Sequence, residues 1–582
     1  MAAPTAGRPD ARLRLIVVTA GGSKLVDLER AVADNVVPGD VVHVMVGHSR
    51  WTAATRALAR HFWGRDPGFT VCMLSLSSLG AVLFRGGLVR KVITGYSGDT
   101  FPNFTPNPVF ARAYASGEVE VEHWSFLTFA QRLECAARGL PAVVTRSLGG
   151  SSMASNDGYA RVSSPFGEIG VLAPLVPDVA LLHGVVADRD GNVALNPPLL
   201  EGVWGALAAR RGAVVTVERI VDDIRPWAHL VLLPAHRVLA VAETPMGAHP
   251  GGLYAPNLPV DGYGEDYEFW VEARAASRGD QFDDWIRHWV REPATQQEYL
   301  ARLGDERIAA LRRKADPSSW KVERDAASPD SSAPPNGWEV AAVHGARRIA
   351  QSVRAKEAHA VLAGAGVANL AAWLGVAQAR EAGSGVQLVA ELGLWGYEPR
   401  PADPYVFNHR NFPTATMAAD TSTVLGMLVG GAETTTVACL GAAQFDRWGS
   451  INSTMIPGGP FLVGSGGGND VASGCSDAVI VATLSPARTP EKLGYVTSPG
   501  DRVSAVATDL GLLEKAGGDE LVLTAVASGP TPVRDRIEAA RAACGWGLEV
   551  ADDVAELPPP TDEEILALRS WDPHGWFLRA RG

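Results

Sequence analysis

The sequence lacks paired cysteines, long apolar runs and an excess of positive charge. Its five cysteines stand singly, with no Cys-x-x-Cys, which argues against a disulfide framework or a cysteine zinc site and predicts reduced thiols in a cytoplasmic protein. The least polar stretch, residues 358–379, carries His359 and Asn369, so we expect a strand, a turn and a helix there instead of a membrane span. Lys and Arg number 52 against 64 Asp and Glu, and this net charge of −12 argues against a nucleic-acid partner.

Three well-known catalytic motifs are also missing. The chain has no G-x-x-x-x-G-K-[ST], no G-x-S-x-G and no H-E-x-x-H, which argues against a P-loop, a nucleophile elbow and a helical zinc site. The 13 histidines show no ligand spacing, so no metal is expected.

What the 582-residue chain does have is enough apolar material for sizeable cores and a clear division into two parts. Hydrophobic residues make up 46% of it and charged residues 20%, as in folded globular proteins. Residues 316–336 are rich in Pro, Ser and Asp and show no apolar periodicity, which is typical of a linker. The sequence therefore predicts domains at 1–315 and 337–582.

Both predicted domains alternate apolar, β-branched runs with segments of helical spacing. Continuous apolar strands separated by helices indicate a mostly parallel sheet covered on both faces, so the predicted fold class is α/β with two tandem Rossmann-like domains. The predicted strands are residues 40–47, 69–75, 91–98, 142–146 and 179–187, then 359–366, 386–393, 434–445, 477–485 and 520–527. The predicted helices are residues 51–62, 128–139, 367–381 and 533–544.

A short pattern occurs once in each predicted domain. Residues 188–193 and 446–451 both read D-R-x-G-[NS]-[VI], and each follows a predicted strand. Two unrelated Asp-Gly turns would also account for this, because such turns are common. The matched strands in front favour a duplicated architecture, with the two turns at equivalent corners.

Glu391 stands at the end of a predicted parallel strand, where α/β proteins place ligands, and Gly393 and Gly396 follow it. Taken alone, the segment also fits an ordinary glutamate in a glycine-rich turn. Another interpretation makes Glu391 the ribose-binding acid of a half dinucleotide fingerprint at residues 364–369, where Asn369 replaces the third glycine. A strand-to-helix turn with close backbone approach explains residues 364–369 more simply.

Residues 463–474 form a glycine run that enters a small-residue helix and contains Gly464, Gly466, Gly467 and Gly468. Successive backbone N–H groups in such a run can form a nest for an oxyanion or a phosphate. A flexible linker fits poorly, because the run lies between apolar strands inside a predicted domain.

Together these segments resemble the β half of family I coenzyme A transferases, in the glutaconate CoA-transferase branch. The motifs are E-x-G-x-x-G at 391–396, G-A-A-Q-F-D-R-W-G-S-I-N-S-T at 441–454 and G-S-G-G-G-N-D at 464–470. The first domain resembles the α half through V-P-G-D at 37–40, T-R-S-L-G-G-S-S at 145–152, A-D-R-D-G-N at 187–192 and P-M-G-A-H-P-G-G at 245–252. The resemblance implies a CoA-transferase-like fold with both halves fused in one chain.

The resemblance also implies that Glu391 is the catalytic nucleophile. In this family the carboxylate attacks an acyl-CoA, and an acyl-glutamyl anhydride and then a glutamyl-CoA thioester form before a second acid takes the CoA. Such covalent catalysis predicts ping-pong kinetics, and exchange of one thioester for another needs no metal and no tightly bound cofactor. The residues expected to bind the oxyanion or CoA are Gly393, Gly396, Gly464, Gly466, Gly467, Gly468 and Asn469.

The acyl pocket is the part where this chain departs from the family. The α half usually carries a Gly-Gly-Phe turn where this chain has Gly47-His48-Ser49-Arg50-Trp51, which leaves the acyl specificity open. We expect His48, Ser49 and Arg146 near the substrate, and structural roles for His48 and Arg146 are the competing interpretation.

Three functions therefore stay open. The first is transfer of CoA between carboxylic acids, including dicarboxylic ones. The second is hydrolysis or carbon–carbon cleavage of an acyl-CoA, and the third is a non-enzymatic ligand sensor, which would need neither Glu391 nor the glycine run. The expected partners are an acyl-CoA and a small carboxylic acid, without nucleic acid or membrane, and such folds are compatible with a homodimer.

Overall fold

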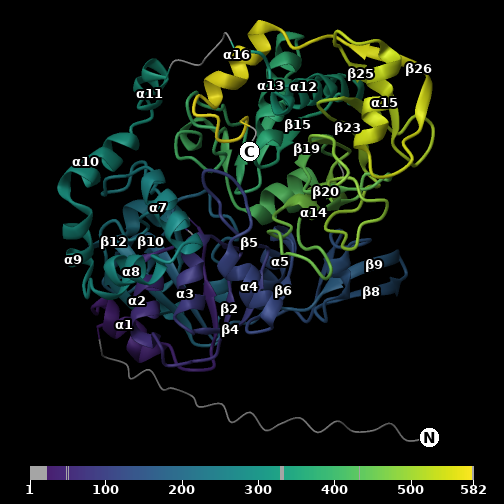
Figure 1. Cartoon of the computed structure of the whole chain (residues 1–582). Coiled ribbons are helices and arrows are strands. Elements are labelled where there is room, and N and C mark those ends of the chain that lie inside the picture. The colour runs from purple at the N-terminus through teal and green to yellow at the C-terminus, as the bar shows by residue number, and fades with distance from the viewer. Residues whose placement is uncertain (1–22, 48, 50, 328–332, 432, 580–582) are drawn as a thin grey trace, which may run out of the picture.

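The computed structural model describes residues 23–47, 49, 51–327, 333–431 and 433–579. These residues form two large, mostly parallel sheets, one in each half of the chain, and helices cover them (Figure 1). In Figure 1 the first half, in purple to teal, lies below the second half, in green to yellow. The predicted α/β fold class is confirmed. The exact domain limits remain a prediction.

The first sheet contains nine of the described strands. Seven of them run parallel in the order β14–β12–β10–β1–β2–β4–β6, and β11 and β13 add antiparallel pairs beside β10. The strands are β1 (Val41–Val44), β2 (Phe69–Cys72), β4 (Val89–Thr94), β6 (Glu120–His123), β10 (Val179–Asp188), β11 (Val193–Ala194), β12 (Gly212–Val221), β13 (Val231–Leu233) and β14 (Val238–Glu243). β10 is buried along its whole length, as its continuous apolar sequence predicts.

One predicted strand of the first half lies elsewhere. The apolar run at 142–146 forms β7 (Val143–Thr145), which joins β9 (Gly167–Leu172) and β8 (Tyr159–Ser164) in a separate antiparallel sheet. Val144 is 55% exposed, so this sheet buries only part of its side chains. A three-residue apolar run does not reveal whether one or both faces are covered, and for that reason the sequence could not place it. A further pair is β3 (Ser75–Leu76) with β5 (Tyr96–Ser97).

The helices of the first half include the two expected from apolar spacing, α2 and α5. A capping box of Ser125 and Thr128 begins α5. The helices are α1 (Leu28–Asn35), α2 (Ala53–Phe62), α3 (Ala81–Arg85), α4 (Pro108–Ser116), α5 (Phe126–Ala137), α6 (Trp204–Ala208), α7 (Tyr267–Arg278), α8 (Phe282–Ile286) and α9 (Gln296–Leu303).

The second sheet contains ten described strands, in the order β18–β17–β16–β15–β19–β22–β23–β24–β25–β26. Its central strands, from β16 to β23, are parallel. The strands are β15 (Ala360–Ala363), β16 (Gln387–Ala390), β17 (Leu394–Trp395), β18 (Met417–Ala418), β19 (Thr436–Gly441), β22 (Asp477–Val481), β23 (Val503–Ala507), β24 (Gly511–Glu514), β25 (Val522–Ala527) and β26 (Val550–Leu557). β20 (Gln444–Phe445) and β21 (Ile451–Asn452) form a small separate pair.

The helices of the second half are α12 (Gly337–Lys356), α13 (Val367–Glu381), α14 (Gly468–Gly474), α15 (Val533–Ala543) and α16 (Asp562–Trp571). The least polar stretch of the sequence forms β15, a turn and α13, as predicted. Within the described ranges, no helix combines the length and the apolar character needed to cross a bilayer.

A helical connection joins the two halves. α10 (Asp305–Lys314) and α11 (Trp320–Ala326) follow α9 along one side of the molecule (Figure 1). α11 lies inside the segment predicted to be a plain linker, and its Glu323 accepts a hydrogen bond from Arg410 of the second half at 2.7 Å. This helix makes a charged contact with a distant residue, which apolar periodicity cannot reveal.

The two halves share one strand order and one turn. β2–β1–β10–β12–β14 in the first sheet corresponds to β16–β15–β19–β22–β23 in the second. The Asp188 carboxylate accepts backbone N–H groups of Gly191 and Asn192 at 2.9 and 2.8 Å, and the Asp446 carboxylate accepts that of Ser450 at 2.9 Å. The pattern noticed in the sequence is thus the same Asp-anchored turn at equivalent corners of both halves.

Candidate functional site

Glu391 directly follows β16, at the edge of the second sheet where its parallel strands end. The hairpin from β16 to β17 carries Gly393, whose φ of +120° brings the backbone against Ala419: a Cβ on Gly393 would lie 2.4 Å from the carbonyl oxygen of Ala419. Gly396 has a φ of +69° and donates its N–H to Leu388 O at 2.7 Å. These two glycines shape the turn that presents Glu391 and are not among the residues lining the cavity described below.

The glycine run meets Glu391. The backbone N–H of Gly467 donates to the Glu391 carboxylate at 3.0 Å. A Cβ on Gly467 would lie only 2.1 Å from the same carboxylate oxygen, so this approach requires a glycine. The structure thereby brings together two segments that are 76 residues apart in the chain.

The other N–H groups of the glycine run have different partners. Gly464 donates to Ser453 O, Gly466 to Gly95 O and Gly468 to Ser465 O, each at 3.0 Å. The Gly466 carbonyl oxygen in turn accepts the N–H of Phe126, so backbone hydrogen bonds connect the glycine run to the first half. Of the predicted nest, therefore, the Gly467 N–H is the one that bonds to Glu391.

A cavity of about 570 Å³ opens over Glu391 and these glycines. Such a volume is typical of small-molecule sites. Both halves contribute to its lining, which includes Ser75, Tyr96, Asn103, Phe104 and Phe126 from the first half and Trp338, residues 364–368, Glu391, Phe407, residues 441–443, residues 463–468, Arg488, Trp576, Phe577 and Arg579 from the second. The turn at 364–368 is part of the half dinucleotide fingerprint in the sequence. It lies at the start of α13 and faces this cavity.

Two cationic side chains line the described part of the cavity, Arg488 and Arg579. The Arg488 guanidinium lies 5.1 Å from the centre of the Trp338 ring and donates to Ala442 O at 2.9 Å. Burial lowers the pKa of Arg488 from its ordinary value. Sequence reasoning missed these residues, because each stands alone in a connecting segment with no motif around it.

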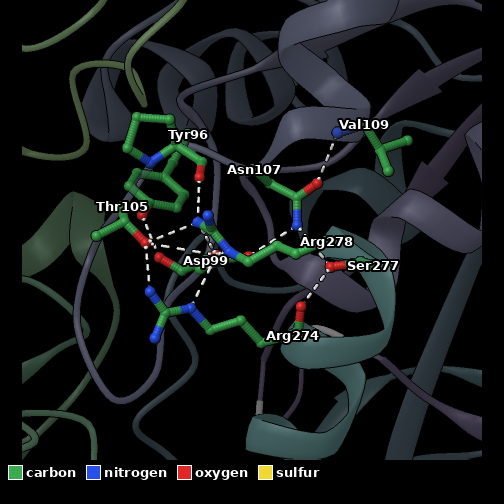
Figure 2. Close-up of polar contacts among 9 residues, drawn as sticks. Tyr96, Asp99, Thr105, Asn107, Val109, Arg274, Ser277 and Arg278 are labelled. Atoms are coloured by element: carbon green, nitrogen blue, oxygen red, sulfur yellow. Dashed lines mark hydrogen bonds and ion pairs between the residues drawn. The ribbon is translucent and has the colours of Figure 1, made fainter. Parts of the chain in front are cut away.

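The first half reaches the cavity through a loop at residues 99–105. Its ends are joined by backbone hydrogen bonds between Asp99 and Thr105, at 2.8 and 3.2 Å. The fully buried Asp99 carboxylate accepts Arg274 Nε at 3.0 Å and Arg278 Nη2 at 2.6 Å, both from α7 (Figure 2). The loop is therefore fixed at its base by a charge cluster.

Asn469 and Asp470 connect the halves. Asn469 Oδ1 accepts the Leu148 N–H and its Nδ2 donates to Thr497 O, both at 2.9 Å, and Asn469 does not line the cavity. The buried Asp470 accepts Ser125 Oγ at 2.5 Å and the Leu127 N–H at 2.9 Å, at the start of α5. Burial raises the pKa of Asp470 to about 6.

Of the predicted acyl-pocket residues, Ser49 and Arg146 do not line this cavity. His48 lies outside the described residues. Ser49 donates to Trp51 O at 2.6 Å and lines a second, smaller cavity of about 40 Å³ together with Leu392. Arg146 is exposed and donates to Gly430 O, and it lines neither cavity.

In the described ranges, no group of three or more His, Cys, Asp or Glu side chains could hold a metal ion. The five cysteines are buried free thiols.

Comparison with known proteins points to one family. The family model for Coenzyme A transferase matches residues 25–244. One of the two subunits of the 3-oxoadipate CoA-transferase of Pseudomonas knackmussii is 33% identical over 196 residues, which is 32% of this chain and 65% of its own length. The other is 32% identical over 156 residues, which is 23% of this chain and 57% of its own length. This chain thus spans less than two thirds of each of these relatives.

Other relatives are similar over more of their length. One polypeptide of the glutaconate CoA-transferase of Acidaminococcus fermentans is 27% identical over 319 residues, covering 50% of this chain and 95% of that polypeptide. One polypeptide of the succinyl-CoA:3-ketoacid coenzyme A transferase of Xanthomonas campestris is 30% identical over 193 residues, covering 33% of this chain and 68% of that polypeptide.

A solved structure shares the fold of nearly the whole chain. The acyl-CoA transferase of E. coli O157:H7, determined as a thioester complex with CoA, superposes with a TM-score of 0.63 and covers 93% of this chain and 96% of its own, at 15% identity. With the family match, the named relatives and this shared fold, the chain belongs to the coenzyme A transferase family.

Proposed function

We propose that this protein is a CoA-transferase that moves CoA from an acyl-CoA to a carboxylic acid, with Glu391 as a covalent carrier. The observation that carries the proposal is the 3.0 Å hydrogen bond from the Gly467 N–H to the Glu391 carboxylate inside a 570 Å³ cavity. A carboxylate at the end of a parallel strand, with a backbone donor beside it, can attack a carbonyl and have the resulting oxyanion stabilised.

The first half-reaction uses the carboxylate as nucleophile. Glu391 attacks the thioester carbonyl of the acyl-CoA, a C–O bond forms, and the C–S bond breaks to release CoA thiolate. The thiolate then attacks the glutamyl carbonyl of this mixed anhydride, and the first acid leaves as its carboxylate. Glu391 now carries CoA as a thioester.

The second half-reaction reverses these steps with another acid. Its carboxylate attacks the glutamyl thioester and displaces the thiolate, which then attacks the new acyl carbonyl and frees Glu391. One thioester is exchanged for another, so the sequence of steps balances without another reactant, and ping-pong kinetics follow. The Gly467 N–H is our candidate donor to the oxyanions, and one such donor contributes about 3–4 kcal/mol.

We assign the nucleotide end of CoA to the part of the cavity that carries Arg488 and Arg579. Guanidinium groups suit phosphate oxygens, and the Trp338 ring beside Arg488 offers an apolar face. The relatives are named for 3-oxoadipate, glutaconate and succinyl-CoA, and by analogy we include dicarboxylic acids among the acyl groups.

Trapping the covalent intermediate tests the proposal. The protein is incubated with acetyl-CoA or succinyl-CoA and treated with borohydride, and the modified peptide is mapped by mass spectrometry. We expect the modification at Glu391. Glu391→Gln should lower CoA exchange by roughly three orders of magnitude or more. Glu398→Gln, which changes an exposed glutamate of the same segment, should leave exchange unchanged. Full exchange by Glu391→Gln would reject the proposal.

A further inference from the structure

The loop at residues 99–105 brings aromatic rings to a point where both halves meet. Phe101 stacks on Tyr267 of α7 with ring centres 4.0 Å apart and planes 3° from parallel. The same ring forms a T-shaped pair with Trp576, with ring centres 4.7 Å apart. Phe104 of this loop lines the cavity.

A turn near the C-terminus brings rings from the other side. The Asp572 carboxylate accepts the backbone N–H groups of Trp576 and Phe577, both at 2.8 Å, and of Leu578 at 3.0 Å. Trp576 and Phe577 line the same cavity as Phe104. The turn is thus shaped by one buried carboxylate, as the loop is by Asp99.

The two carboxylates that hold the loop and the turn do not line the cavity. Asp99 and Asp572 are both buried, and neither lines the cavity. Charge and hydrogen bonds therefore fix the loop and the turn outside the cavity, while aromatic rings from both segments face it. The two phenyl rings offer no hydrogen-bond partner to water and the indole offers a single N–H donor, so an ordered water is poorly held beside them.

We propose that an aromatic wall, formed by the lining residues Phe104, Trp576 and Phe577, decides whether a carboxylic acid or water accepts the acyl or glutamyl group. The inference rests on the function proposed above. Both covalent intermediates hydrolyse readily, and closure of a site against water is a recognised way to prevent this side reaction. Rings supplied by both halves would keep out bulk water while CoA and the acid are bound.

The competing reaction is hydrolysis of the glutamyl thioester. Water attacks the glutamyl thioester carbonyl at Glu391, a C–O bond forms, the C–S bond breaks, and CoA leaves as the free thiol after proton transfer. The Glu391 carboxylate is regenerated with one oxygen from water. In a transfer turnover, by contrast, that oxygen comes from the acceptor acid.

The test compares two rates in each variant: CoA release from succinyl-CoA without an acceptor acid, and acyl-CoA formation with acetate as acceptor. For Trp576→Ala and Phe104→Ala we expect the ratio of hydrolysis to transfer to rise about tenfold or more. In water enriched in oxygen-18, the Glu391 peptide of these variants should become heavier faster. Trp571→Ala is the matched control, since Trp571 packs on Trp373 at 5.6 Å and does not line the cavity.

The outcomes separate this inference from the proposed function. If the unmodified protein shows no CoA exchange, the proposed function fails. If it exchanges CoA normally and the folded wall variants keep its ratio of hydrolysis to transfer, this inference alone is wrong. Should Trp576→Ala or Phe104→Ala not fold, Trp576→Leu and Phe104→Leu, which keep apolar side chains, decide by the same ratio and the same isotope label.

Discussion

Gly467 shows how a single residue type can be required by a contact instead of by its backbone. Its φ of −82° and ψ of 0° suit any residue, so no conformational strain demands glycine there. The demand comes from Glu391, whose carboxylate oxygen occupies the space of a Cβ. The glycine run is thus tied to the nucleophile candidate by sterics as well as by a hydrogen bond.

Gly467→Ala should therefore displace the Glu391 carboxylate without unfolding the loop. We expect kcat for CoA exchange to fall about 100-fold, because a shift of this kind at a reacting group costs that much. Gly468→Ala is the matched control, since a Cβ there would lie 3.7 Å from Ser498 Oγ, an ordinary contact. Equal activity of both variants in a steady-state exchange assay would argue against a role for the Gly467 contact.

Arg488 allows a test of which part of CoA lies beside it. We expect Arg488→Gln to raise KM for an acyl-CoA about tenfold, because a charge-assisted hydrogen bond to a phosphate is lost. With an acyl-pantetheine, which has no phosphate, KM should not change. Arg534→Gln, at an exposed position of α15, is the control for general charge effects. An equal loss with both thioesters would place the phosphates elsewhere.

Among helices and strands, those with long apolar patterns followed the sequence most closely. The apolar spacing of residues 367–381 predicted α13 with the same limits, because a helix buried on the sheet must repeat its apolar face every turn. β7 and α11 did not follow this rule: one is a short, half-exposed strand, and the other is held by the contact of Glu323 with Arg410. The position of such short elements is set by their tertiary contacts.

The start of α12 matters for the cavity because Trp338 lies in its first turn. Asn336 accepts the N–H groups of Trp338 at 2.9 Å and Glu339 at 3.2 Å, which completes a capping box. Asn336→Ala should lower the free energy of unfolding by about 1 kcal/mol, the usual loss for such a cap. Asn336→Asp, which keeps a side-chain acceptor at the cap, should leave the free energy of unfolding unchanged. Thermal denaturation followed by circular dichroism distinguishes them, and equal midpoints for all three proteins would contradict the prediction.

For the molecule as a whole, one contact between the two halves includes a carboxyl group whose protonation depends on pH. Asp470 joins α14 to α5 across the two halves. Burial raises its pKa from 3.8 to about 6, so the folded protein favours the protonated form more than the unfolded chain does. Its contribution to stability is fully present below pH 3.8 and is lost as the pH rises through about 6.

Asp470→Asn should remove this dependence. Between pH 4 and pH 6 the unfolding free energy of the variant, relative to the unmodified protein, should therefore rise with pH and then level off. The difference between the two proteins is the quantity to measure, by denaturant unfolding at several pH values, because other carboxylates with lowered pKa, such as Asp266, act in the opposite direction in both. A constant difference would show that Asp470 does not titrate in this range.

The sequence by itself determined the two α/β halves, their repeated Asp-anchored turn and the two segments that carry Glu391 and the glycine run. These features are local: apolar periodicity, a turn residue or a motif specifies each of them within a few residues. Only the tertiary structure decided that, within the glycine run, Gly467 is the residue that bonds to Glu391, that Asn469 joins the halves, and that Arg488 and the aromatic wall lie at the cavity. These depend on contacts between residues far apart in the chain, which close packing in three dimensions creates and no linear pattern records.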